Sequence, residues 1–142
     1  MTDPEPVCAV DANVIVRYLV RDDPRHDEAA QDIMRGVSTG KRRLLCDPVI
    51  LSEVVFVLGS VYHLPRERIS EGLTDLLLAP GLLMPGKNLY LRALALFATD
   101  VPHFGDACAC ALAMAECEGR LYSFDRKLSS LNGITRLDKL TR

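Results

Sequence analysis

The sequence predicts an α/β fold, because short apolar runs alternate with helical segments along its 142 residues. The composition indicates a folded domain with a sizeable core. Hydrophobic residues make up 49% of the chain, which is enough for a substantial core, and aromatic residues make up only 6%, so that core should be mostly aliphatic. The length suits one domain, which we expect to span residues 1–142 with a loose, Pro-rich tail at residues 1–6.

The first strand is expected at residues 7–10, a fully apolar run that is typical of a buried strand in a parallel sheet. Either Asp11 or Asn13 can cap the helix that follows. Asp23 and Pro24 suit the N-cap and the first position of a second helix, because that position needs no backbone N–H.

The rest of the chain continues this alternation. A helix from Pro48 to about Tyr62 is rich in valine and leucine, and an amphipathic helix follows at residues 66–78. The helix expected at residues 107–117 is apolar on nearly every face, which indicates a central, buried position. The other expected elements are strands at 44–46, 82–84, 121–124 and 134–137 and a helix at 88–99.

Composition excludes several classes of protein. The net charge is −2, so a nucleic-acid-binding surface would have to be local. The five cysteines are odd in number and form no CxxC pair, which favours small buried thiols in a reducing compartment. No apolar run reaches roughly 18 residues without a charge and no signal peptide is visible, so we expect a cytoplasmic protein with no membrane partner.

Four acids stand in apolar local sequence: Asp11, Glu53, Asp106 and Asp125. A carboxylate carried into a core must be paired, hydrogen-bonded, protonated or bound to a cation. Two of these acids end predicted strands and two lie near the starts of helices, so all four could face one end of the sheet. Carboxylate oxygens are the natural ligands of Mg²⁺ or Mn²⁺, and without a cation the four charges would repel. The set therefore predicts a divalent metal site.

Each acid also has a structural explanation. Asp11 suits an N-cap, and Asp106 begins a helix whose dipole favours a carboxylate. Asp125 follows a strand, in a turn where aspartate is common. Glu53 is the most informative of the four because its helix is apolar on almost all sides, although an exposed stripe that passes through Ser52 would also accommodate it.

Four segments in order carry a family resemblance: residues 10–19, 51–58, 104–107 and 123–128. With these motifs the chain resembles the PIN-domain ribonucleases, specifically the VapC-type toxins of toxin–antitoxin pairs, over roughly residues 7–138. Each motif alone is weak, but the four together, in this order, are specific.

The resemblance implies a three-layer α/β/α fold with a small central parallel sheet, and metal-dependent cleavage of RNA. It also implies a small antitoxin that blocks the acidic site, and assembly as a homodimer. Asp11, Glu53, Asp106 and Asp125 match the family's acidic positions and are the expected catalytic residues and metal ligands. Asn13 and Ser123 match polar positions that support those ligands.

One position departs from the family pattern. Many relatives carry a further Asp directly before the Phe of the third motif, where this chain has His103, so either one or two metal ions would suit the site. The expected contacts to RNA phosphates are Arg17, Arg126 and Lys127.

Two other functions compete with a nuclease. One is a non-catalytic PIN-like module that binds RNA or protein, against which the presence of all four acids argues. The other is a phosphate-handling receiver domain or phosphatase, but Asp11-Ala12-Asn13 lacks the paired acids that those proteins need. The RNA target, whether transfer, ribosomal or messenger RNA, is open at this point.

Overall fold

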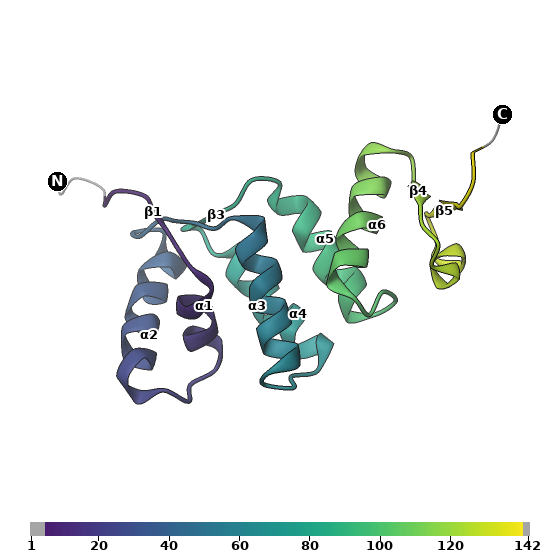
Figure 1. Cartoon of the computed structure of the whole chain (residues 1–142). Coiled ribbons are helices and arrows are strands. Elements are labelled where there is room, and N and C mark those ends of the chain that lie inside the picture. Colours follow the sequence, from purple (N-terminus) through teal and green to yellow (C-terminus); the bar gives the residue numbers. More distant parts are fainter. Residues whose placement is uncertain (1–4, 141–142) are drawn as a thin grey trace. The chain divides into compact units, whose positions relative to one another are not determined.

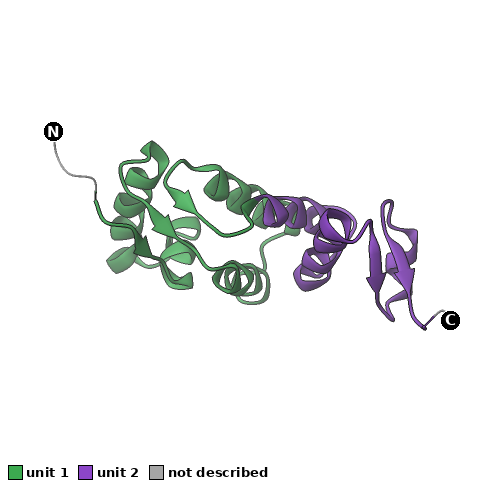
Figure 2. Ribbon diagram, turned by 90° about the horizontal axis from the view of Figure 1, so that it is seen from above, with its two compact units in different colours: residues 1–87 green, residues 88–142 purple. Residues whose placement is uncertain are grey.

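The computed structural model describes residues 5–140. The chain divides into two compact units, Met1–Lys87 (unit 1) and Asn88–Arg142 (unit 2) (Figure 2). Most of the tail predicted at residues 1–6 lies outside the described residues. Glu5, which is described, forms an ion pair with Arg42. The expectation of a single domain stays a prediction.

Unit 1 holds a small parallel sheet (Figure 1). Its strands are β1 (Cys8–Ala9), β2 (Leu44–Leu45) and β3 (Leu82–Leu83), in that order across the sheet. Both pairs are parallel, which confirms the predicted α/β class. The helices of this unit are α1 (Ala12–Leu19), α2 (Pro24–Thr39), α3 (Pro48–Ser60) and α4 (Arg66–Leu78).

Strand β1 corrects one expectation. The apolar run at residues 7–10 was predicted to be buried, but Cys8 and Ala9 are exposed and only Val10 of that run is buried. Among the described residues β1 pairs with β2 alone and is an edge strand, and its neighbours leave Cys8 and Ala9 uncovered, whereas Leu82 on the opposite edge strand is buried. An apolar sequence therefore predicted the strand correctly and its burial incorrectly.

Aspartates cap the first two helices of unit 1. Asp11 accepts a hydrogen bond from the Val14 N–H at 3.2 Å and caps α1, so it and not Asn13 is the cap. Asp23 caps α2 by accepting from the Arg25 N–H at 3.1 Å, with Pro24 in the first turn as predicted.

The core of unit 1 is aliphatic, as the composition predicts. Each large side chain that is removed from water in this way stabilises the fold by about 1.5–3 kcal/mol. The largest fully buried side chains of the unit are Ile15, Met34, Val37, Leu51, Val54, Leu58, Ile69, Leu73, Leu77 and Leu82.

Unit 2 begins within α5 (Lys87–Ala98) and continues with α6 (Phe104–Glu116). Strand β4 (Arg120–Tyr122), a short 3-10 helix η1 (Arg126–Ser130) and β5 (Thr135–Leu137) complete it, and the two strands pair in parallel. Between α6 and β4, Gly119 has a φ of 81°, and a Cβ there would collide with the Gly133 carbonyl oxygen, so this turn requires glycine.

Helix α6 corrects a second expectation. It was predicted to be buried on nearly every face, but Leu112 is 50% exposed and Ala109 and Ala115 are exposed as well. The side of α6 that includes Ala107 and Cys110 is buried. Because alanine and cysteine fill both sides of the helix, the sequence carries no polar stripe that marks the solvent side. Within residues 5–140, no helix has the length and apolar character needed to cross a membrane.

Candidate active site

Asp11 and Asn13 lie together in unit 1, at the carboxyl end of β1, where they line a cavity of about 490 Å³ with Arg17. Both side chains are exposed. The Oδ1 atom of Asp11 is occupied by the N–H of Val14, and within the described chain its Oδ2 atom makes no hydrogen bond. Asp11 can therefore cap α1 with one oxygen and offer the other to a ligand.

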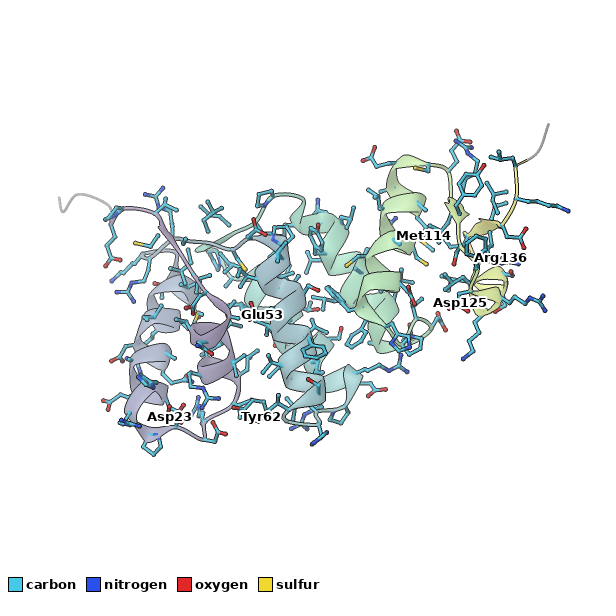
Figure 3. All side chains as sticks on the ribbon, viewed as in Figure 1. Asp23, Glu53, Tyr62, Met114, Asp125 and Arg136 are labelled. Atoms are coloured by element: carbon cyan, nitrogen blue, oxygen red, sulfur yellow. The ribbon has the colours of Figure 1, made fainter. Side chains whose placement is uncertain are left out.

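Glu53 lies in the middle of α3 and is exposed (Figure 3). Its neighbours on the exposed side of the helix include Val49 and Phe56, which are 72% and 71% exposed. The expectation that apolar surroundings make Glu53 a costly buried charge is therefore wrong. The role of Glu53 as a metal ligand stays a prediction, now without that energetic support.

Asp106 and Asp125 line one cavity of about 410 Å³ in unit 2, and His103 and Lys127 line it with them. Asp106 is half-buried in the first turn of α6 and accepts no hydrogen bond within the described residues, so it is not the cap of that helix. Asp125 caps η1, since its Oδ1 accepts from the Lys127 N–H at 3.0 Å.

The pKa of the Cys110 thiol reflects the negative charge of this cavity. Burial raises the pKa of Cys110, and the carboxylates of Asp106 and Asp125 raise it further. Both carboxylates are thus close enough to act on one buried group, and neither has an ion-pair partner in the described chain. Oxygen donors without a basic partner suit a hard divalent cation.

The four acids are divided between the two units. Asp11 and Glu53 belong to unit 1, whereas Asp106 and Asp125 belong to unit 2. Among the residues that the structure describes, no group of three His, Cys, Asp or Glu side chains has an arrangement that could hold a metal ion.

The sequence of the chain matches the PIN domain family over residues 8–134. This chain belongs to the PIN domain family. The match covers nearly all of the predicted range, and it confirms the PIN-like α/β/α fold. PIN domains are generally nucleases that use divalent metal ions, in agreement with the oxygen donors at the cavity of Asp106 and Asp125. No curated protein matches the chain.

The basic residues of this PIN domain differ in how much of their charge is available. Arg17 donates hydrogen bonds to Asp22 and to the Tyr62 hydroxyl. Desolvation lowers the pKa of Arg17, but these two partners outweigh it and the net pKa is raised. Arg126 and Lys127, in contrast, are exposed and form no ion pair in the described part of the chain. The contacts of Arg17 favour a structural role. The charges of Arg126 and Lys127 are available to bind phosphate.

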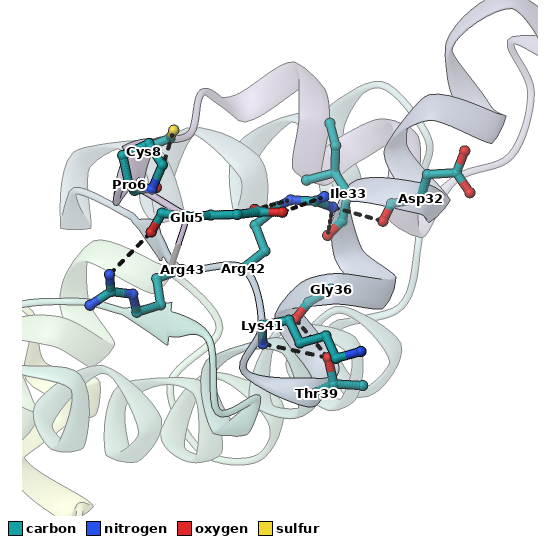
Figure 4. Close-up of polar contacts among 10 residues, drawn as sticks. All are labelled: Glu5, Pro6, Cys8, Asp32, Ile33, Gly36, Thr39, Lys41, Arg42 and Arg43. Carbon is teal, nitrogen blue, oxygen red and sulfur yellow. Dashed lines mark hydrogen bonds and ion pairs between the residues drawn. The ribbon is translucent and has the colours of Figure 1, made fainter. Parts of the chain in front are cut away.

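The basic turn before β2 is also structural (Figure 4). Arg42 donates to the Glu5 carboxylate at 3.1 Å and to the carbonyl oxygens of Asp32 and Ile33 at 3.0 and 3.1 Å. Arg43 donates to the Glu5 carbonyl at 3.1 Å. These contacts tie the start of the chain to the last turns of α2.

Two features of this PIN domain were missed by sequence reasoning. Phe124, directly before Asp125, is 88% exposed although it was assigned to a strand. Arg136 on β5 has a nearly buried side chain that donates to the Ser123 carbonyl. Exposure and long-range hydrogen bonds leave no local pattern in the sequence, so no motif could have revealed that Phe124 is exposed or that Arg136 contacts Ser123.

Proposed function

We propose that this PIN domain is a divalent-metal-dependent endoribonuclease and the toxin of a toxin–antitoxin pair. One observation carries the proposal: in a chain of a nuclease family, Asp106 and Asp125 line one cavity and neither has a basic partner in the described chain. The toxin role is supported by the resemblance of the four sequence motifs to VapC-type proteins. With it we propose a cytoplasmic location, a small antitoxin as partner, and a homodimer.

The metal ligands of this proposal are Asp11, Glu53, Asp106 and Asp125, with Mg²⁺ or Mn²⁺ as the ion. The oxygen-only donor set fits these cations better than softer ones. When bound, such an ion lowers the pKa of a water molecule and stabilises charge on a phosphoryl oxygen.

The protein's own side chains hold the substrate and the acids in place. Lys127 lines the cavity of the two acids and can contact a phosphate there, and the adjacent Arg126 is exposed and can contact the next one. Ser123 supports Asp125, because its Oγ accepts the Asp125 N–H at 3.0 Å. Phe124 presents an exposed ring on which an unpaired base could stack, which favours single-stranded RNA.

Cleavage mapping in total RNA tests the proposal. The purified chain with Mg²⁺ should cut RNA at defined positions, and Asp106→Asn, prepared in the same way, should not. Excess EDTA should abolish cutting and added Mg²⁺ should restore it. Complete cleavage in the presence of EDTA would exclude the metal-dependent reaction.

A non-catalytic PIN-like module that binds RNA or protein is the second candidate. It predicts that the parent chain and Asp11→Ala bind RNA equally and that neither cuts it. The toxin role has its own test: expression of the parent chain should arrest growth, whereas expression of Asp106→Asn should not. A neighbouring gene for a small DNA-binding protein that relieves the arrest would identify the antitoxin.

A further inference from the structure

Arg136 lies on β5 in unit 2 (Figure 3) and contacts three different residues. Its Nη1 donates to the Ser123 carbonyl oxygen at 2.8 Å, and its Nε donates to the Ser129 hydroxyl at 2.6 Å. It also forms an ion pair with Asp138 at 3.2 Å, and only 14% of its side chain is exposed. A guanidinium in this setting has lost most of its water and replaced it with fixed partners.

These contacts converge on the turn that carries Asp125. The Ser123 N–H donates to the Leu137 carbonyl at 2.9 Å, so Ser123 is attached to β5 through both its N–H and its carbonyl oxygen. The Ser123 hydroxyl then accepts the Asp125 N–H at 3.0 Å. A chain of hydrogen bonds therefore runs from Arg136 through Ser123 to Asp125.

We propose that Arg136 is a positioning residue for the Asp125 carboxylate, acting through the Ser123 peptide. It holds Ser123 and Ser129, which lie on either side of Asp125 in the sequence, and so restricts the turn between them. The ion pair with Asp138 offsets the cost of the nearly buried charge. The expected effect of Arg136 on RNA cleavage rests on the proposed nuclease function. Its effect on the position of Asp125 does not.

Arginine is specifically suited to this role. Its planar group presents donors in fixed directions, so Nε and Nη1 can serve two acceptors at once. Lysine would keep the charge, but its donors all lie on one nitrogen, so it would lack the two separate donor atoms that reach Ser129 and Ser123. Arg136→Lys therefore removes the positioning contacts while it leaves the electrostatics of the turn largely in place.

The test compares Arg136→Lys, Ser123→Ala and the double variant with a matched control, Arg120→Lys. Arg120 lies on the paired strand β4 and forms an ion pair with Glu118 on the surface. For RNA cleavage with Mg²⁺, we expect both single variants to lower kcat about 10- to 100-fold with KM almost unchanged, the usual effect of losing such a supporting contact. The kcat of the double variant should be no lower than that of the slower single variant, because both substitutions break the same chain of hydrogen bonds to Asp125. The control should match the parent.

A second measurement does not depend on catalysis. Amide hydrogen exchange of the metal-free protein should show faster exchange at the Asp125 N–H in Arg136→Lys, with the amides of β4 and β5 unchanged. If exchange at Asp125 equals that of the parent, or if the two kcat losses multiply in the double variant, the positioning role is wrong. If the parent cuts no RNA while exchange at Asp125 changes as expected, the nuclease proposal fails and the positioning contact stands.

Discussion

Asp106 and Asp125 line one cavity, yet they come from different elements, the first turn of α6 and the turn after β4. Both carboxylates add to the effect of burial in raising the pKa of the Cys110 thiol. Neither is neutralised by an ion pair among the described residues. Two unpaired negative charges on one cavity repel each other unless a cation is present.

Asp106→Asn should therefore leave the stability of the metal-free protein unchanged or raise it. Relief of the repulsion offsets the loss of a favourable contact with the helix dipole, which is about 0.3–1 kcal/mol. Thermal unfolding in EDTA measures this, and Asp125→Ala is the comparison: it relieves the same repulsion but also loses the cap of η1, so it should be less stable than Asp106→Asn by about 0.5–2 kcal/mol. A clear loss of stability in Asp106→Asn would mean that the dipole contact matters more than the metal site.

Asp11→Asn separates the two roles of Asp11. Asparagine caps a helix about as well as aspartate, so stability should change by less than about 0.5 kcal/mol, whereas Asp11→Ala should lose about 1 kcal/mol. RNA cleavage should be lost in both variants, because both lack the carboxylate. Cleavage at the parent rate by Asp11→Asn would show that Asp11 is a helix cap only.

Reversing the charges of Arg126 and Lys127 to Glu should weaken RNA binding. Each lost phosphate contact should reduce the slope of log K against log salt by about 0.7 for a single strand. Titration of a fluorescent RNA at several salt concentrations measures both quantities. The matched control reverses Arg25 and Lys41, two exposed charges of unit 1, and should keep both affinity and slope. Equal losses in the two double variants would indicate a general charge effect instead of a local contact.

The thiols of the buried Cys46 and the half-buried Cys108 should react slowly. Burial raises the pKa of Cys46 and of Cys108 from 9.0 to about 11, so at pH 8 their thiolate fraction should be about 100-fold below that of an ordinary thiol. A coloured disulfide reagent should therefore label the exposed Cys8 first. Because the folded pKa lies above the unfolded one, the stability these thiols contribute is complete below pH 9.0 and is lost as the pH rises toward about 11. Equal labelling rates for Cys8 and Cys46 would contradict the burial of Cys46.

Local chemistry explains which predictions succeeded. The helix at 66–78 was predicted to the residue, and the cap at Asp23 with Pro24 was correct, because capping and amphipathic spacing act within a few residues of the chain. The four acidic motifs were enough to place the chain in its family for the same reason. Of the site itself, the Ser123 hydroxyl accepts the Asp125 N–H, a contact between residues two apart, and the role of Ser123 in supporting a metal ligand stays a prediction.

The sequence by itself thus determined the order of strands and helices, the cap that begins the second helix, the aliphatic core and the family. Only the tertiary structure decided which apolar residues face solvent: β1 became an exposed edge, α6 exposed Leu112, and Glu53 came to lie on an open helix face. Only the tertiary structure placed Asp106 and Asp125 on one cavity and gave Arg136 its hydrogen bond to the Ser123 carbonyl. Burial and long-range contacts depend on which neighbours a segment receives, and an apolar pattern is the same whether or not a neighbour covers it.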